Sequence, residues 1–295
     1  MITFIINPIS GGVSPDAARA RAELASAIVD GRGDPAEVFV TERQGHAREL
    51  TKAAVARGAR LVMAWGGDGT INEVASALAF GEVPLGIVPA GSGNGLARQL
   101  SIGAEPAAAI RRAIGAEPRR IDVGELEDRL FVNVAGIGFD AHVAWKFNDA
   151  ARRRRGLVTY ASIAGRALMN YEPATYTIRT GLENERCAPV RAVLITVANS
   201  PEFGNGAIIA PGAKIDDGEL DLVVIEEHSR LNTIVQLPRL FRGTVDRARG
   251  CSIRRITRAS IESDRAMQYH VDGEPALGGT TLRVRVHPAA LYVAV

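Results

Sequence analysis

Short apolar segments alternate with helical segments through roughly the first 125 residues, and this alternation restricts the fold more than any other feature. The segments Ile2–Ile6 and Leu61–Trp65 carry almost no polar side chains, as expected of strands that are buried on both faces. Such strands, alternating with helices, predict a doubly wound α/β domain with a mostly parallel sheet. The expected strands are Ile2–Ile6, Glu37–Thr41, Leu61–Trp65 and Pro84–Val88, and the expected helices are Pro15–Asp30, His46–Arg57, the segment from Thr70 to Phe80, and Glu105–Ile114.

The pattern changes near Leu130 to short strand-like segments separated by turn residues. Many short strands at such spacing predict an antiparallel β-sandwich or barrel, of which we expect the sandwich. We therefore expect two domains, residues 1–127 and 128–295, with substrate bound in a cleft between them. The expected strands are Phe131–Val134, Tyr176–Arg179, Val193–Val197, Leu220–Ile225, Ile253–Thr257, Met267–Val271 and Thr281–Val286, and helical patterns lie near Leu157–Tyr171 and Leu231–Phe241.

The composition of the 295 residues excludes several classes of protein. A net charge of +2 is too small for nucleic acid to be the main partner. Two cysteines without ligand-like spacing indicate neither a disulfide framework nor a zinc site. No apolar stretch approaches the roughly 20 residues of a membrane span, and no basic leader is visible, so we expect a soluble, cytoplasmic protein.

The glycine-rich segment from Gly66 to Thr70, between a buried strand and a helix, suggests an anion site. Its glycines let the backbone approach a ligand, and the start of a helix presents unpaired N–H groups to negative charge. Asp68 would repel a phosphate unless Mg²⁺ lies between them, since magnesium binds carboxylate and phosphate oxygens together. The alternative is a purely structural turn in which Asp68 is a local cap.

Two further loops, Asn7–Gly12 and Pro89–Asn94, follow the first and fourth expected strands. Loops after parallel strands gather at one edge of the sheet, where ligands bind, and Thr41 would lie on the same edge. The chain contains neither the dinucleotide fingerprint nor the P-loop motif, so the loops suggest a different kind of nucleotide phosphate site. Taken alone, Asn7 and Ser10 are better explained by an Asx or Ser turn.

Short motifs follow one another in a fixed order along the whole chain. They are Asn7-Pro8 with Ser10-Gly11, Gly66–Thr70 with Asn72-Glu73, Gly91–Asn94, Asp122–Gly124, Gly136–Ala141, Asp216–Asp221 and Val271–Glu274. This ordered set resembles the bacterial diacylglycerol kinase catalytic-domain family, the lipid kinases that also include sphingosine kinases. The resemblance implies an NAD-kinase-like α/β nucleotide domain joined to a β-sandwich. It also implies transfer of the γ-phosphate of ATP to a lipid hydroxyl, that of diacylglycerol or a related lipid such as a sphingoid base.

Through this resemblance, Asp68 would organise magnesium and phosphate, and Glu274 would be the general base. A structural Mg²⁺ near the Asp216–Gly218 turn would use the backbone carbonyls of Lys214 and Glu219 and the side chain of Asp217, with Asp122 joined through water. A homodimer is consistent with the family. The implied ATP-binding residues are Asn7, Pro8, Ile9, Ser10, Gly11, Thr41, Gly67, Asp68, Gly69, Thr70, Ile71, Asn72, Glu73 and Ser92.

One residue departs from the family pattern. Diacylglycerol kinases usually carry an Asp after the Asn of the second glycine-rich loop, and that Asp is thought to touch the acceptor hydroxyl. Here Asn94 is followed by Gly95, as in a sphingosine-kinase style of loop. We therefore expect Asn94 and Gly95 near the acceptor, whose identity stays open.

A lipid kinase meets its substrate at a membrane surface, and two basic segments suit this role. Each surface arginine near anionic lipid contributes about 1 kcal/mol. A solvated helix face is the alternative for either segment. The segments are Arg152–Arg155 and the group Arg239, Arg242, Arg247, Arg249, Arg254, Arg255 and Arg258. We expect peripheral association with the inner membrane surface.

Two other functions remain open from the sequence. An NAD kinase-like enzyme would share the Gly66–Thr70 loop but not the motifs at Gly91–Asn94 and Asp272–Glu274. A nucleotide- or lipid-binding regulator that has lost turnover would explain Gly95, although Asp68 and Glu274 are both present.

Overall fold

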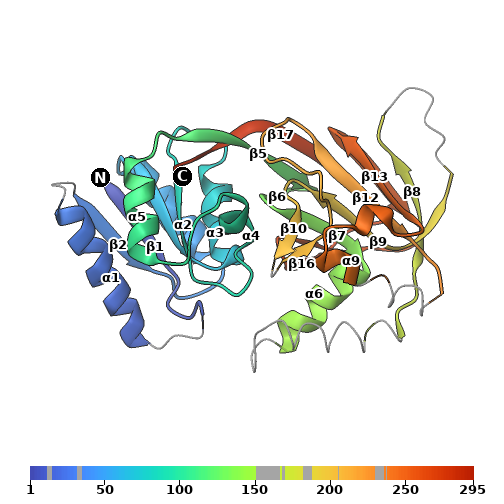
Figure 1. Ribbon diagram of the computed structural model, residues 1–295, viewed down its shortest axis with the longest axis horizontal. Coiled ribbons are helices and arrows are strands. Elements are labelled where there is room, and N and C mark those ends of the chain that lie inside the picture. Colours follow the sequence, from blue (N-terminus) through green and yellow to red (C-terminus); the bar gives the residue numbers. More distant parts are fainter. Residues whose placement is uncertain are drawn as a thin grey trace. The chain divides into compact units, whose positions relative to one another are not determined.

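The computed structural model describes residues 1–11, 15–31, 35–150, 167, 170–181, 188–204, 206–229, 236 and 238–295. These residues form two units (Figure 1). The first comprises Met1–Ile121 together with Ala289–Val295, and the second comprises Asp122–Pro288. The run Arg152–Arg155 and most of the helical patterns expected near Leu157–Tyr171 and Leu231–Phe241 lie outside the described residues.

The first unit contains the predicted parallel sheet with helices between its strands. The strand order is β4-β3-β1-β2, and each of these pairings is parallel. Its elements are β1 (Ile2–Ile6), α1 (Pro15–Asp30), β2 (Ala36–Val40), α2 (His46–Ala56), β3 (Leu61–Gly66), α3 (Asp68–Leu78), β4 (Leu85–Pro89), α4 (Gly95–Gln99) and α5 (Pro106–Gly115). The sequence predicted all of them except the short helix α4.

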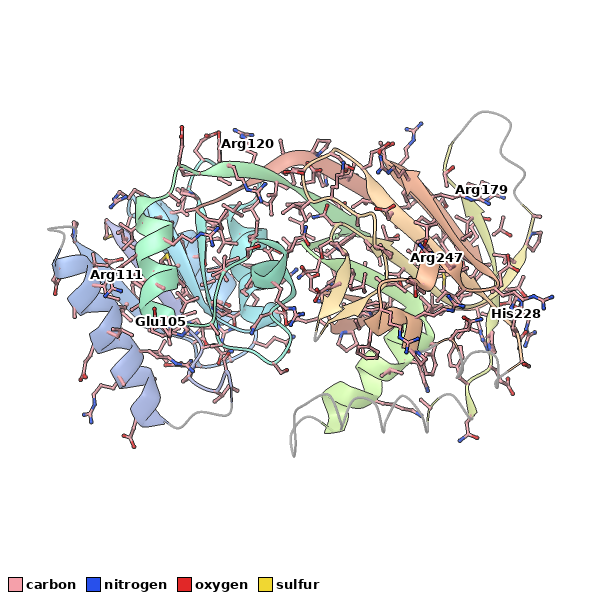
Figure 2. All side chains as sticks on the ribbon, in the orientation of Figure 1. Glu105, Arg111, Arg120, Arg179, His228 and Arg247 are labelled. Atoms are coloured by element: carbon pink, nitrogen blue, oxygen red, sulfur yellow. The ribbon has the colours of Figure 1, made fainter. Side chains whose placement is uncertain are left out.

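Local sequence explains these elements well. Strands β1, β3 and β4 are buried along their whole length, and Phe4, Met63 and Ile110 pack in one cluster between sheet and helices. Each large apolar side chain buried there contributes about 1.5–3 kcal/mol. Glu105 caps the N-terminus of helix α5 (Figure 2), because its carboxylate accepts the N–H groups of Ala107 and Ala108.

The second unit is the antiparallel β-sandwich-like domain that the sequence predicted. Strand β9 lies beside β12 on one edge and beside β7 and then β8 on the other, all antiparallel. Its elements are β6 (Arg129–Phe131), β7 (Val134–Gly138), α6 (Phe139–Ala150), β8 (Ala174–Arg179), β9 (Val190–Ala198), β10 (Glu202–Gly204), β11 (Ala207–Ile208), β12 (Leu220–Glu226), α9 (Pro238–Phe241), a 3₁₀ turn (Val245–Arg247), β13 (Cys251–Ile256), β14 (Arg258–Ser263), β15 (Gln268–Val271) and β16 (Glu274–Leu277).

The expected single strand Phe131–Val134 was wrong, because its residues belong to two strands, β6 and β7. Val132 and Asn133 between them donate their N–H groups to the carboxylate of Asp272. This side-chain acceptor replaces a strand partner, so the chain leaves one strand and enters another at this point. The sequence also failed to predict β14, β16 and α6.

Two long strands belong to both units. They are β5 (Arg119–Leu126), which was not predicted, and β17 (Thr281–Val293), which was predicted only as far as Val286. Near the end of β17, Val293 pairs in parallel with Leu85 of β4. The last residues are therefore part of the first unit, which comprises residues up to Ile121 and again from Ala289.

Within the described part of the chain, no helix has the length and apolar character needed to cross a membrane.

Candidate active site

Three loops of the first unit, which follow β1, β3 and β4, are joined by side-chain hydrogen bonds. The hydroxyl of Ser10 accepts the N–H of Gly67 at 3.2 Å, and the Asn7 side-chain amide donates to the Thr70 hydroxyl at 2.9 Å. Asn7 also accepts the N–H of Ile9 at 3.1 Å, so it does form the Asx turn that was the structural alternative. The same residue therefore shapes its own loop and ties it to the helix start at Thr70.

The second and third loops touch through glycines. A Cβ atom on Gly91 would lie 2.7 Å from the Cα of Gly67, and one on Gly67 would lie 3.2 Å from the Cα of Gly91. The 2.7 Å distance is far below an ordinary carbon contact of about 3.5–4.0 Å, and the 3.2 Å distance is somewhat below it. Glycine at Gly91 therefore allows the two backbones to approach in this way, and glycine at Gly67 makes the approach easier.

Asp68 connects the second loop to the third. Its two carboxylate oxygens accept the N–H groups of Asn94 at 2.9 Å and Gly95 at 2.7 Å, at the start of α4. Burial raises the pKa of Asp68, and the bonds from Gly95 and Asn94 offset part of this effect. A carboxylate has about four acceptor positions, so these two bonds leave acceptor capacity for water or for a magnesium ion.

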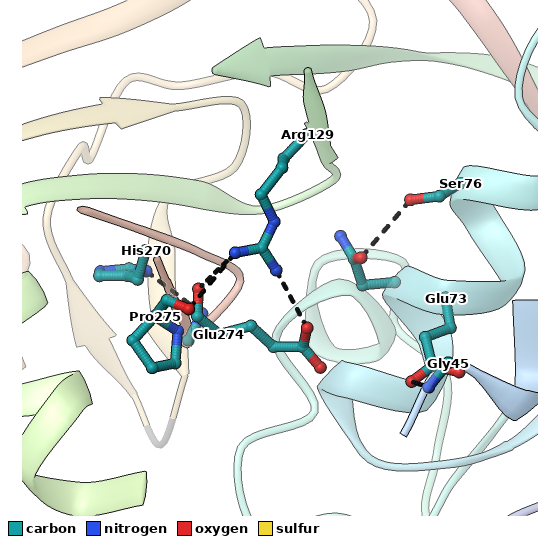
Figure 3. Close-up of polar contacts among 9 residues, drawn as sticks. Gly45, Glu73, Ser76, Arg129, His270, Glu274 and Pro275 are labelled. Carbon is teal, nitrogen blue, oxygen red and sulfur yellow. Dashed lines mark hydrogen bonds and ion pairs between the residues drawn. The ribbon is translucent and has the colours of Figure 1, made fainter. Parts of the chain in front are cut away.

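Glu73, an expected ATP-binding residue, acts on a neighbouring helix in this structure. Its carboxylate accepts the N–H groups of Gly45 at 2.7 Å and Ala47 at 3.0 Å (Figure 3). Helix α2 has no side-chain cap of its own at Gly45, and negative charge is favourable at a helix N-terminus. Glu73 thus holds the start of α2 next to α3.

The remaining expected ATP-binding residues differ in what they expose. Thr41 directly follows β2, is buried, and donates its N–H to the carbonyl of Ile6 at 2.8 Å. Ile71 is buried in the core, so only its backbone could meet a ligand, whereas Ser92 and Ile9 are exposed.

Asn72 is buried and accepts a bond from Ser76 (Figure 3). Pro8, Gly11 and Gly69 are also in these loops or at the start of α3.

Arg21 of α1 is a candidate that the sequence analysis missed. Its guanidinium donates to the carbonyls of Asn7 at 2.9 Å and Ser10 at 3.0 Å, and it lies 5.7 Å from the centre of the Trp65 ring. Burial lowers its pKa. An arginine in a helical segment gives no signal of this contact, yet it places a positive charge at the first loop.

Asn94 and Gly95, the residues expected near the acceptor, close the third loop. The Asn94 side chain bonds both the N–H and the carbonyl of Gly91 at 2.8 Å, and Asn94 itself adopts a left-handed conformation, with φ 52°. Gly95 contributes only its N–H, to Asp68. Both positions therefore fix the loop around Asp68.

In the second unit, Glu274 begins β16 after a tight turn. Asp272 and Gly273 in this turn have φ angles of 46° and 83°, the left-handed conformation of a two-residue hairpin turn. Arg129 lies over the strand that follows. Its guanidinium is 3.2 Å from Glu274 Oε2 and donates to the carbonyls of Glu274 and Pro275 at 3.4 Å (Figure 3).

The turn itself is anchored by Asp272 and His270. Asp272 accepts the N–H groups of Val132, Asn133 and Val134 at 2.9–3.0 Å. The buried His270 ring lies 2.8 Å from the carboxylate of Asp140 in α6, and its other nitrogen accepts the N–H of Gly273. Burial lowers the pKa of His270, but the charge and hydrogen bond of Asp140, together with the charge of Asp272, raise that pKa overall. His270 therefore helps to hold the turn before Glu274.

The expected metal residues lie around the Asp216–Gly218 turn. Asp217 accepts the N–H of Glu219 at 3.2 Å, and the buried Asp122 accepts the N–H of Gly218 at 2.7 Å. The carboxylate of Glu219 pairs with Arg255 at 3.4 Å, so the predicted contact of Glu219 with a cation concerns its backbone carbonyl and not its side chain. Among the described residues, no three His, Cys, Asp or Glu side chains are arranged around a metal position, so a cation here would depend on carbonyl oxygens.

Two family descriptions match consecutive parts of the chain. Residues 1–126 match the diacylglycerol kinase catalytic domain, and residues 133–295 match the YegS C-terminal NAD kinase beta sandwich-like domain. The chain therefore belongs to the diacylglycerol kinase and YegS-like family of lipid kinases.

Individual relatives agree with this assignment. A Chromohalobacter salexigens protein named "Probable lipid kinase YegS-like" is 33% identical over 252 residues, covering 84% of this chain and 78% of its own length. A diacylglycerol kinase of Mycobacterium tuberculosis is 31% identical over 301 residues, covering 99% of this chain and 94% of its own length. The crystal structure of a diacylglycerol kinase from Bacillus anthracis has the same fold, with a TM-score of 0.73 at 19% identity over 99% of this chain and 96% of that one.

Proposed function

We propose that this protein is an ATP-dependent lipid kinase that transfers the γ-phosphate to a lipid hydroxyl, that of diacylglycerol or a sphingoid base. The observation that carries the proposal is the junction of three loops in the first unit. Ser10 bonds Gly67, Asn7 bonds Thr70, and Asp68 bonds the third loop. Family membership supports the same activity.

The nucleotide phosphates would bind the loop N–H groups and the N-terminus of α3. The first N–H groups of a helix have no partner within it and favour negative charge, and α3 begins at Asp68 directly after Gly67. Arg21 adds positive charge behind the first loop. Phosphoryl transfer depends mainly on positioning and charge neutralisation, which this set of groups supplies.

Asp68 would hold a magnesium ion at the phosphates, and the residues fit such an ion. Its carboxylate retains acceptor capacity beyond its two backbone bonds, and magnesium keeps several of its waters while binding one or two carboxylates. When bound, the ion neutralises charge on the phosphates. Asp68 would orient the ion through a carboxylate that its bonds to Asn94 and Gly95 hold in place.

Glu274 would accept the proton of the lipid hydroxyl. The carboxylate is half-buried beside Arg129, and a guanidinium at this distance favours the ionised form, which is the form that accepts a proton. A general base must lie within about 3 Å of the proton that it removes. This assigns the nucleotide to the first unit and the proton acceptor to the second.

A structural magnesium ion at Lys214, Asp217 and Glu219 also fits the local charge. Burial raises the pKa of nearby Asp221; Arg255 offsets part of this, and Asp217 and Glu219 raise the pKa further. A cation would relieve this accumulation of negative charge. Oxygen donors from carboxylates and carbonyls are those that magnesium prefers.

The protein would meet its lipid as a peripheral protein at the inner membrane surface. Arg242, Arg247 and Arg249 are exposed around the 3₁₀ turn, and Phe241 beside them is 54% exposed. Flotation with anionic and neutral vesicles tests this proposal, because binding that is equal for both vesicles would contradict an electrostatic contact. The homodimer stays a prediction, which a molar mass from light scattering would test.

The acceptor is identified by incubating the protein with labelled ATP, Mg²⁺ and separate acceptors: diacylglycerol, sphingoid base, ceramide, monoacylglycerol and NAD. We expect a labelled product with diacylglycerol or the sphingoid base. Labelled NADP would instead indicate the NAD kinase-like alternative. ATP binding without a labelled product from any of these acceptors would indicate the regulator.

A further inference from the structure

Glu274 begins a short strand that does little by itself to hold the carboxylate. In the described part of the chain, β16 pairs with β15 alone, and the Glu274 side chain is 24% exposed. A flexible glutamate in such a place samples several rotamers. A proton acceptor must keep one orientation, so something beyond the strand has to fix it.

Arg129 is placed to provide this orientation. One guanidinium nitrogen lies 3.2 Å from Glu274 Oε2, and the other donates to the backbone carbonyls of Glu274 and Pro275 at 3.4 Å. The planar guanidinium therefore joins the side chain of Glu274 to its own strand (Figure 3). An ammonium group could not reproduce this geometry, because it is a point charge without the rigid fork of arginine.

The backbones that carry the two residues are themselves bound together. Asp272, just before Glu274, accepts the N–H groups of Val132, Asn133 and Val134, just after Arg129. Strand β6 is also anchored by the buried Phe131 and by its pairing with β5. The ion pair thus forms between two fixed segments rather than between two mobile surface side chains, and it loses less side-chain entropy than an ordinary surface pair.

We propose that Arg129 is a positioning residue of the kinase reaction, which holds the Glu274 carboxylate in one orientation and in its ionised form while touching neither nucleotide nor lipid. This inference rests on the proposed role of Glu274. Other charged and titratable groups lie around this pair. They are Glu127 and Asp128 in the turn between β5 and β6, Tyr269 and His270 in β15, Asp272 in the turn between β15 and β16, and Asp140 in α6.

Arg129→Gln and Arg129→Lys test the proposal. In R129Q we expect kcat to fall about 10–100-fold, the cost of a misplaced reacting group. The KM for ATP should be unchanged, because the nucleotide is assigned to the other unit. In the pH dependence of kcat/KM, the acidic limb should shift to higher pH by about 1 unit, since a neighbouring cation lowers a carboxyl pKa by about 1–3 units. In R129K the acidic limb should stay at its wild-type pH, because the positive charge is kept, while kcat should still be reduced.

Arg285→Gln is the matched control, because Arg285 also pairs with a glutamate of the second unit, Glu125, at 2.8 Å. It should leave kcat and the acidic limb unchanged. Thermal melting of every variant separates loss of fold from loss of positioning. If R129Q fails to fold, R129K takes its place. A folded R129K with a reduced kcat and an unshifted acidic limb of its pH profile then supports the proposal.

Wild-type kcat and an unmoved limb in R129Q would overturn the inference, as would wild-type kcat in R129K if R129Q does not fold. Glu274→Gln, measured in parallel, keeps the two claims apart. Full turnover in E274Q removes the proposed base itself, whereas an inactive E274Q with a fully active R129Q removes only the role of Arg129. An NMR titration of the Glu274 carboxyl gives a readout without any acceptor: its pKa should rise in R129Q and stay unchanged in R285Q.

Discussion

The two units hold their candidate residues by the same kind of bond but over very different distances in sequence. In the first unit, Asp68 binds Asn94 and Gly95 in a loop that follows the neighbouring strand. In the second unit, Asp272 accepts the backbone N–H groups of Val132–Val134, which lie 138 to 140 residues earlier in the chain. In both units an aspartate binds backbone N–H groups and so fixes a loop beside the residues proposed for the chemistry. A motif aspartate can thus be structural and functional together.

This comparison predicts different losses for the two units, and the largest follows from Asp68. We expect Asp68→Ala to lower magnesium-dependent turnover by about 10³-fold or more, the scale of a charge-stabilising group in phosphoryl transfer. It removes the proposed magnesium contact and releases the third loop together. Steady-state kinetics and calorimetric binding of Mg-ATP measure the two effects, and weakened binding should accompany the lost turnover. Asp30→Ala, at an exposed aspartate at the end of α1 and outside these loops, is the control, and wild-type rates in D68A would contradict the assignment.

Glu274→Gln should separate chemistry from nucleotide binding. We expect turnover to fall about 10²–10⁴-fold, the usual contribution of a general base. Binding of Mg-ATP should be nearly unchanged, because glutamine keeps the size of the side chain and the nucleotide is assigned to the first unit. Kinetics at saturating ATP with a calorimetric binding curve checks both. If E274Q weakens ATP binding as strongly as D68A does, the division of roles between the units is wrong.

Asp272→Asn tests the structural half of the comparison. The carboxylate accepts three backbone N–H groups, whereas asparagine would turn an N–H₂ group toward some of these donors. Bonds to a charged group contribute about 1.5–3 kcal/mol each, so we expect the free energy of unfolding to fall by about 3 kcal/mol. Urea denaturation measures it, with the exposed Asp264→Asn as control. A loss equal to that of D264N would show that the turn does not depend on Asp272.

Gly91→Ala should have a smaller effect, on the contact between the glycine loops. The added Cβ would lie 2.7 Å from the Cα of Gly67 and 2.9 Å from Asn94 Oδ1, so the loops must separate. Overpacking of this kind costs about 1–3 kcal/mol, and we expect ATP affinity to fall about 10-fold as the loops move. Gly103→Ala, where a Cβ meets nothing within 4 Å, is the control. Equal ATP affinity in the two variants would argue against a tight junction of loops.

The distances in sequence also explain what could be predicted. The parallel sheet and the loops at its edge follow from local apolar runs and glycines, and Gly67 and Asp68 could be placed from the strand before them. Arg129 could not, because its partner Glu274 is far along the chain and neither residue carries a local signal of the pairing. The separate strands β6 and β7 were missed for the same reason, since Asp272 divides them from a distance. Whether the predicted ATP and metal residues bind those ligands stays a prediction.

The smallest expected effect is on the pH dependence of stability, where one carboxylate from each unit should act in opposite directions. Burial raises the pKa of Asp68. Burial also raises that of Glu125, but Arg285 and His287 outweigh it and lower the pKa overall. The stability that Asp68 contributes is therefore present below its unfolded pKa, about 3.9, and is lost as pH rises through the folded pKa. The contribution of Glu125 is present above its unfolded pKa, about 4.3, and is lost as pH falls through the folded pKa.

Urea denaturation of wild type, D68N and E125Q measures how the free energy of unfolding changes with pH. The measurement runs between pH 3.5 and 7, a range set by the ordinary carboxyl pKa values of about 4. As pH falls, wild type should gain stability relative to D68N and lose stability relative to E125Q. The second change should stay below about 1 kcal/mol, because Arg285 is exposed and solvent screens the pair. Two differences that move in the same direction would mean that Asp68 is held as an ordinary ion-paired carboxylate rather than as a buried one. The contrast between the units would then be limited to the sequence distance of their contacts.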